Sequence, residues 1–414
     1  MAAPSNILVA VQTYQESLLG ALQNYACLLS TSNKRFENFQ NFIGQLGTTV
    51  QIKLPYRFNT VNSQVAQFQA IEQRFATLTV DKPISSSIEM TSAEFIYNIE
   101  NDMDRMVRDM AAEIGTNIEA NLATVAETKP YRFYGSPSTP FTSKYQLSAA
   151  LTQFRNIGMP KTGTKGYITD SCVDAIIAND LAQFVMNRNE KEANSWELEN
   201  FSACDWYRSN LLTVHEAGSE GNAGSTLTVV SVTKDADDAV TSITFSGTSA
   251  ATDADSVKLH DRFYFVDGVS GKPNMRFLTW IGHKVSASPV QFRATANSDA
   301  SGSQVTVSVY PPLKASAGKN QNINEEIVAG MQCKVLADHR VGMVTANDPF
   351  YLAMPRLPST EPFASATQYD ADTGASLRVY QGERFGLNER GVIVDGIYGF
   401  TAIPEYTQAI IFPV

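Results

Sequence analysis

The sequence predicts an α+β fold that carries an inserted, barrel-like β domain. A long helix with an apolar stripe is expected within residues 93–130, and a mixture of helices and short strands follows it. Residues 219–326 contain mainly short strands separated by Asp, Gly and Ser turns. Mixed segments return after residue 326, so the β-rich part interrupts the α+β region instead of following it.

Residues 1–45 are expected to form an N-terminal arm. Apolar residues, among them Leu18 and Leu22, recur at helical spacing, and the polar residues 30–33 end the pattern. A lone helix with an apolar stripe has to bury that stripe. The arm should therefore pack against the body of the same subunit or against a neighbour.

Residues 46–92 predict an extended hairpin and the strand that follows it. Apolar and polar residues alternate over residues 50–54, a polar, glutamine-rich stretch covers residues 59–73, and apolar positions return over residues 78–90. A two-stranded hairpin of this size is marginal in isolation, so it needs a partner surface.

The strongest helical pattern begins after a cap at Thr91 or Ser92 and ends before Pro130. Its apolar residues keep a spacing of three or four: Met103, Met106, Val107, Met110, Ile114, Ile118, Leu122 and Val125. The charged residues, including Glu119, are expected on the opposite side. At 1.5 Å per residue, about 30 residues would make a spine about 45 Å long.

The rest of the chain divides by composition. Residues 131–218 read as the first part of an α+β domain, with helices around residues 147–154 and 173–185 and a strand at 167–169. The glycine-rich run 218–224 is interpreted as a flexible hinge before the β domain, residues 219–326. Residues 327–375 return to the α+β domain, and residues 376–414 supply closing strands.

Composition and motifs exclude several classes of function. The net charge of −10, without clustered Lys and Arg, argues against sequence-specific binding of nucleic acid. No stretch is long and apolar enough to span a membrane, and no basic signal-peptide start precedes Lys34. The four cysteines are far apart and read as reduced, buried residues, which favours folding in a cytosol.

The sequence also lacks recognisable motifs for catalysis, cofactor binding or metal binding. The four histidines show no metal-ligand spacing, and neither a phosphate-binding loop nor a dinucleotide fingerprint is present. Residues 370–374 weakly match a calcium loop, but the acidic residue expected at its twelfth position is Gln381. We therefore expect no catalytic, cofactor-binding or metal-binding residues, and no cofactor.

The order of parts resembles the Hong Kong 97-like major capsid proteins of tailed phages: N-arm, E-loop, P-domain with spine helix, and A-domain. Residues 47–55 are similar to the strand that opens the E-loop, residues 350–358 to the segment after the A-domain, and residues 376–380, 394–399 and 403–405 to the final P-domain strands. The inserted β domain resembles that of coat proteins from short-tailed lambdoid phages.

The resemblance implies a capsid protein that self-assembles, through pentamers and hexamers, into the icosahedral shell of a virion. Implied partners are other copies of the chain, a portal protein and packaged double-stranded DNA that is held without sequence-specific contact, with no membrane. The arm starts at once, so a separate scaffolding protein is expected to direct procapsid assembly in the host bacterial cytoplasm.

Two alternatives remain open at this point. One is another virion protein or an encapsulating nanocompartment shell, although such shells are normally shorter and lack the insertion. The other is an enzyme or carbohydrate-binding protein with a β domain, which the empty search for chemistry disfavours.

The subunit interface is predicted at the arm and the hairpin, since neither has enough core to order alone. The candidate residues are Leu18, Leu22, Lys53, Arg57, Phe58, Phe68, Arg74 and Lys82.

Overall fold

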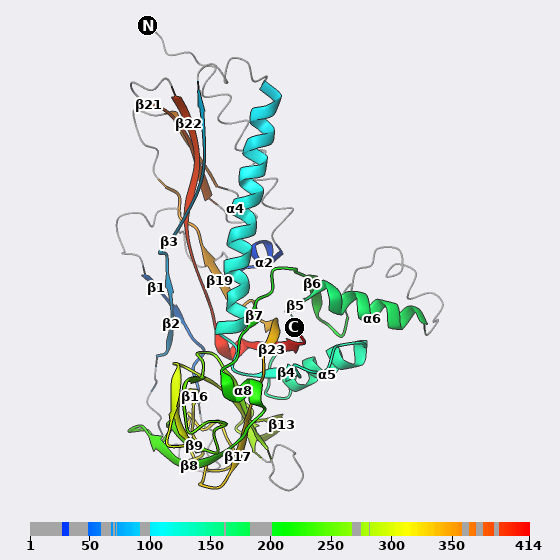
Figure 1. Ribbon diagram of the computed structural model, residues 1–414, viewed down its shortest axis with the longest axis vertical. Helices are drawn as coiled ribbons and strands as arrows, with labels where there is room; N and C mark the ends of the chain where they lie inside the picture. Colours follow the sequence, from blue (N-terminus) through cyan, green and yellow to red (C-terminus); the bar gives the residue numbers. More distant parts are fainter. Residues whose placement is uncertain are drawn as a thin grey trace. The chain divides into compact units, whose positions relative to one another are not determined.

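A computed structural model describes residues 27–32, 49–58, 68, 71, 73–91, 100–160, 163–182, 201–266, 275–280, 282–357, 364–369, 376–384 and 389–414 (Figure 1). The chain divides into two compact units. The first contains Met1–Lys53, Phe75–Ala123 and Phe350–Ala402, and the second contains Leu54–Arg74, Thr124–Pro349 and Ile403–Val414.

The first unit combines a long helix with antiparallel strands. Its elements are α2 (Cys27–Thr31), β1 (Thr49–Lys53), β2 (Phe75–Thr79), β3 (Lys82–Thr91), most of α4 (Glu100–Thr128), β19 (Phe350–Ala353), β20 (Ala364–Tyr369), β21 (Ser376–Arg384) and β22 (Glu389–Ala402). Strand β22 is central, because it pairs with β19, β21 and β3. The predicted hairpin is confirmed: β1 pairs with β2 in antiparallel register, Thr49 opposite Thr79.

The expected spine helix is confirmed over Glu100–Thr128, while residues 92–99, with the proposed cap at Ser92, lie outside the described residues. Met110, Ile114, Ile118, Leu122 and Val125 are all buried, as their spacing predicts.

The prediction that Glu119 lies on the polar side of this helix is wrong. Its side chain is buried, and its carboxylate accepts hydrogen bonds from the Leu28 N–H at 2.9 Å and from the Cys27 thiol at 3.2 Å. Both donors belong to α2, which begins at Cys27, so Glu119 supplies an acceptor for amides at the start of that short helix.

The second unit contains a six-stranded sheet and a barrel. The sheet has the order β4-β23-β18-β5-β6, with β7 also paired to β18, and its strands are β4 (Phe133–Gly135), β5 (Thr164–Ile168), β6 (Asp205–Arg208), β7 (Val214–His215), β18 (His339–Ala346) and β23 (Thr407–Phe412). The 3₁₀ turn η2 (Pro404–Tyr406) directly precedes β23. Helices α5 (Lys144–Arg155) and α6 (Asp170–Ala182) share a buried core with this sheet. Both helices were expected, although α6 begins three residues before the predicted Val173.

The β-rich region forms a closed barrel. Its strands are β8 (Thr226–Lys234), β9 (Val240–Ser246), β10 (Thr252–Val257), β11 (Arg262–Val266), β14 (Gln291–Ala294), β15 (Ser298–Ser301), β16 (Gln304–Leu313) and β17 (Gln332–Val335), with β12 (Arg276–Leu278) and β13 (Val285–Pro289) as a separate pair. Six strands, β16-β14-β11-β17-β8-β9, close through the β16–β9 pairing. Strand β17 follows residue 326, the expected end of the inserted domain, and the domain boundaries stay predictions.

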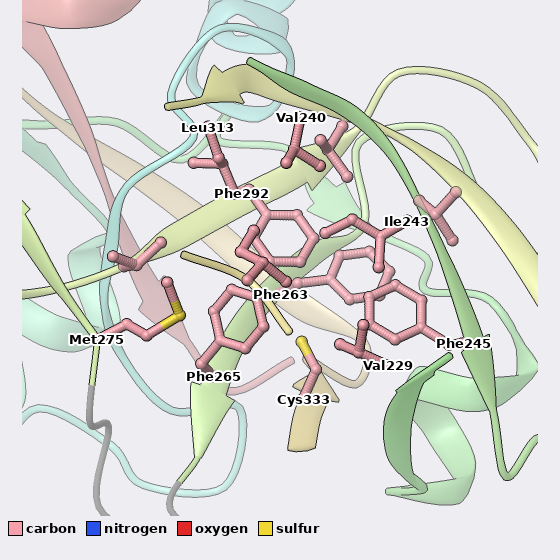
Figure 2. Close-up of a cluster of buried hydrophobic side chains, with 14 of the residues drawn as sticks. Val229, Val240, Ile243, Phe245, Phe263, Phe265, Met275, Phe292, Leu313 and Cys333 are labelled. Carbon is pink, nitrogen blue, oxygen red and sulfur yellow. The ribbon is translucent and has the colours of Figure 1, made fainter. Parts of the chain in front are cut away.

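Aromatic rings fill this barrel (Figure 2). The Phe292 ring stacks on Phe263 with centroids 5.1 Å apart, and Phe263 stacks in turn on Phe245 at 5.9 Å. Alternating strand residues supply these rings, as a barrel requires of inward-facing positions.

The interpretation of residues 218–224 as a flexible hinge is wrong. Ser219–Ala223 form a short helix, α8. A Cβ atom added to Gly218 would lie 2.4 Å from the Ser256 carbonyl oxygen, and one added to Gly221 would lie 2.4 Å from that of Leu336. These glycines permit close backbone packing, which the sequence pattern alone cannot distinguish from flexibility.

Candidate interaction surface

The candidate surface begins at the base of the hairpin loop, in residues 54–58 and 73–74, directly after the pair formed by Lys53 and Phe75. The Leu54 N–H donates to the Arg74 carbonyl at 2.9 Å, so the two chain segments still run side by side here. Arg57 and Arg74 then turn their guanidinium groups to one carboxylate, that of Glu405 in η2.

Glu405 is the anchor of this base. Its side chain is buried, with Oε1 in contact with Arg74 Nη2 and 3.5 Å from Arg57 Nη2. Burial and the neighbouring Arg74 lower the pKa of Arg57 from its usual value, and its guanidinium carbon lies 4.5 Å from the Trp280 ring centroid. An ion pair shielded from water in this way fixes geometry better than an exposed one.

A third arginine holds η2 from the other side. Arg132 is fully buried, and its Nη2 donates to the backbone carbonyls of Glu405 and Thr407. The rings of Tyr131 and Phe154 lie 5.5 and 5.3 Å from its guanidinium carbon. The turn that carries Glu405 is therefore held by Arg132 as well as by the two hairpin arginines.

A cavity of about 200 Å³ adjoins the anchor. Its wall includes Arg57, Arg74, Trp280, Lys314 and Glu405. Cations and carboxylates alternate around it, so it favours neither sign of charge strongly enough to specify a ligand.

Beyond the base, the hairpin segment presents large apolar side chains to solvent. The exposed fractions are 47% for Tyr56, 60% for Phe58, 100% for Phe68 and 67% for Ile71. We call these four residues the hairpin patch. Single exposed apolar residues are ordinary, and four of them within one segment, from position 56 to position 71, are what the predicted interface requires. Complete burial of each would contribute about 1.5–3 kcal/mol.

The predicted interface residues separate into three groups. Phe58 and Phe68 are exposed, as an interface needs, and Lys53 is exposed at the end of β1. Arg57 and Arg74 are engaged with Glu405 in the same chain, and the Lys82 ammonium lies 4.3 Å from the Phe400 ring centroid. Leu18 and Leu22 lie outside the described residues. The interface itself stays a prediction.

Sequence reasoning missed the anchor. Glu405 is separated from Arg57 by 348 positions, and nothing local marks the contact. The one local signal near Glu405 was the preceding Pro404, which indicates the start of the 3₁₀ turn but not the contact with the arginines.

Two features of the described residues bear on catalytic chemistry: the side-chain groupings that could hold metal ions and the properties of the thiols. They contain no group of three or more His, Cys, Asp or Glu side chains placed to hold a metal ion. None of the four cysteines, all of which lie among the described residues, forms a disulfide, and burial raises the pKa of Cys172 and of Cys204 to about 12, which disfavours the reactive thiolate. Within the same described part of the chain, no helix has both the length and the apolar character needed to cross a membrane. Residues 370–374, the weak calcium-loop match, lie outside it.

Comparison with known proteins found no matching family model and no matching curated protein. Among solved structures, the chain is similar to one from Mycobacterium phage Che8, with 8% identity, a TM-score of 0.47 and coverage of 93% of this chain and 90% of that one. It is similar to the capsid of cyanophage P-SCSP1u, with 11% identity, a TM-score of 0.42 and coverage of 92% and 88%. It is also similar to a virus-like particle from Pyrococcus furiosus, with 6% identity, a TM-score of 0.41 and coverage of 97% and 98%. Similarity at this level does not by itself assign a function.

Proposed function

We propose that this chain is the major capsid protein of a tailed phage, which assembles with copies of itself into the icosahedral shell around double-stranded DNA. The observation that carries the proposal is the hairpin patch. Tyr56, Phe58, Phe68 and Ile71 are exposed on a segment whose base is anchored by Arg57 and Arg74, so the chain presents apolar area that a single subunit leaves in water.

The division of the chain supports the same function. A shell subunit needs a stable body and extended parts that complete their packing on neighbours. The barrel and the six-stranded sheet each hold a closed apolar core, whereas the hairpin shares only a small one, in which Ile52 and Leu78 are buried with Val80 and Ala353. Homo-oligomers with obligate contacts bury such extended parts between subunits.

The finer assignment follows from the sequence resemblance. We infer a Hong Kong 97-like subunit of the short-tailed lambdoid type, with the barrel as its inserted domain, forming pentamers and hexamers. A separate scaffolding protein, a portal protein and packaged DNA would be its partners, and the subunit would fold in the bacterial cytoplasm before it enters the virion. The second candidate is a nanocompartment shell, which would use the same patch but enclose a protein cargo.

The test compares the wild-type chain with a Phe58→Ser, Phe68→Ser double variant. Electron microscopy and sedimentation velocity of purified protein, alone and with its scaffolding protein, should show shells or capsomers for the wild type. The double variant should stay unassembled while its thermal unfolding midpoint changes little, because both side chains are already in water.

The control is Tyr145→Ser, since Tyr145 is 80% exposed but lies on α5 outside the patch. This variant should assemble normally. Normal assembly of the double variant, or a wild-type chain that stays monomeric at high concentration, would overturn the proposal. Shells that contain protein cargo and exclude DNA would favour the nanocompartment.

A further inference from the structure

A buried cluster of charged residues surrounds His215 in the second unit. It consists of His215, Glu127, Asp261, Arg262 and His339, which we call the His215 cluster. The His215 Nδ1 lies 2.8 Å from Glu127 Oε1, and its Nε2 lies 2.8 Å from Asp261 Oδ1. Only 3% of the His215 side chain and none of the Asp261 side chain is exposed.

The contacts fix the protonation of His215. Both of its nitrogens face carboxylate oxygens, which accept hydrogen bonds, so both nitrogens have to carry protons and the ring has to be an imidazolium. The neighbouring His339 ring differs from His215 in its protonation. Its Nδ1 donates to the Ala337 carbonyl, and its Nε2 accepts from the Arg262 guanidinium at 3.0 Å, so this histidine is neutral.

The cluster joins four elements, α4, β7, β11 and, through His339, β18. Glu127 lies in the last turn of α4, which contains no basic residue of its own, and a carboxylate is unfavourable at a helix C-terminus. Arg262, at the start of barrel strand β11, donates from Nη2 to the Ala126 and Glu127 carbonyls and so caps that helix end. His215, on β7, then links the Glu127 side chain to Asp261 of the barrel.

Loss of the His215 proton would not affect the two carboxylates equally. Asp261 would keep the N–H donors of Gly218 and Lys258, at 3.1 and 2.7 Å. Glu127 has His215 as its side-chain hydrogen-bond partner, and 23% of its side chain is exposed. A neutral imidazole can donate to only one carboxylate, so the contact to Glu127 is the one that opens. A shallow hollow lined by Glu127, His215, Glu216, Lys258 and Asn297 gives solvent access to this point.

We propose that His215 is a pH-sensitive connection between the end of α4 and the barrel, closed when the imidazole is protonated and open at the Glu127 side when it is neutral. The proposal is independent of the capsid function. Its consequence is a helix end that gains freedom at alkaline pH while the Arg262 cap and the Asp261 contact stay in place.

The direction of the pH dependence follows from the contacts. Burial alone would lower the pKa of His215, but the hydrogen bonds that it donates to Asp261 and Glu127 outweigh this effect and raise the pKa above 6.5. The connection therefore contributes fully below about pH 6.5 and is lost as pH rises through the raised folded-state pKa. Burial lowers the pKa of His339 to about 3 and of His260, beside Arg293, to about 4. Burial also lowers the pKa of Arg262, to about 10. None of these three groups changes charge between pH 6 and 9.

The test is a pH titration of the full-length wild-type chain. NMR of ¹⁵N-labelled histidine should show His215 with two protonated nitrogens at pH 6.5. Hydrogen-exchange protection of amides in residues 124–129, corrected for the intrinsic rate, should fall between pH 6 and 9, because the Glu127 side chain loses its donor when His215 loses its proton. Amides of Met343 to Ala346, the part of β18 that pairs with β5 and not with β7, should show no such fall.

A His215→Gln variant, whose side chain is neutral at every pH, should already show the high-pH exchange at pH 6 and lose the pH dependence. His283→Gln is the matched control and should behave as the wild type, because His283 contacts the Phe58 carbonyl and not this cluster. A neutral His215 at pH 6.5, or an unchanged pH profile in His215→Gln, would overturn the proposal. The wild-type titration decides alone if the variant does not fold.

Discussion

Replacing Phe292 by alanine tests whether the barrel core is as tightly packed as its geometry indicates. The Phe292 side chain is completely buried, with the Phe263 ring 5.1 Å away in a stacked arrangement and the Phe265 ring at 5.5 Å (Figure 2). Removing a buried phenylalanine costs about 3–5 kcal/mol, and more when the surroundings cannot collapse into the cavity. The closed ring of six strands resists collapse, so we expect about 4 kcal/mol.

The same substitution at Phe58 provides the matched control. Because 60% of that side chain is exposed, Phe58→Ala should destabilise the unassembled subunit by less than about 0.5 kcal/mol. Urea titration of the full-length chain, read by hydrogen exchange of amides in β11 and β14, measures the barrel separately from the other unit. Equal effects of the two substitutions, or a loss below about 1 kcal/mol at Phe292, would refute the packing argument.

Three further outcomes follow from single contacts. Gly221→Ala should lower the unfolding midpoint measured by calorimetry, since the new Cβ would lie 2.4 Å from the Leu336 carbonyl oxygen. Gly302→Ala is the control: its Cβ would have no neighbour within 4 Å, so only the positive φ should lower the free energy of unfolding, by about 1 kcal/mol. Glu119→Ala should expose the Leu28 amide to hydrogen exchange, because its carboxylate acceptor is lost, and an unchanged rate would contradict the assignment. Cys172, whose pKa burial raises to about 12, should react with iodoacetamide at pH 8 only after denaturation, and rapid labelling of the native chain would contradict its burial.

Much of the fold could be predicted because its signals are local. The stripe from Met110 to Val125 and the alternation around Ile52 specify a helix and a strand through the periods of 3.6 and 2 that burial of one face imposes. The turn over Asp235 and Asp238 is equally local: Asp235 Oδ1 accepts from the Asp237 and Ala239 amides, as expected of a hairpin turn.

The errors share one physical cause, which is that the deciding partner is distant in sequence. Glu119 looked solvated because its position on the helix cannot reveal that amides 91 residues earlier need an acceptor. Gly221 looked flexible because only the fold brings the Leu336 backbone against it. The anchor at Glu405 and the His215 cluster were missed for the same reason, since each joins residues that lie far apart along the chain.

The ion pairs at Glu405 and at His215 differ in how they respond to pH. At the hairpin base, Glu405 faces arginines, whose charge persists at any physiological pH, so this anchor is permanent in solution. At the end of α4 the cation facing Glu127 is a histidine, whose charge is conditional. Arginines at Glu405 suit a contact that has to persist at every pH. A histidine at Glu127 suits a helix end whose contact has to open and close. Replacing the histidine by a permanent cation, as in His215→Arg, should therefore remove the pH response of the end of α4. The exposure of Phe58 and Phe68 should stay unchanged.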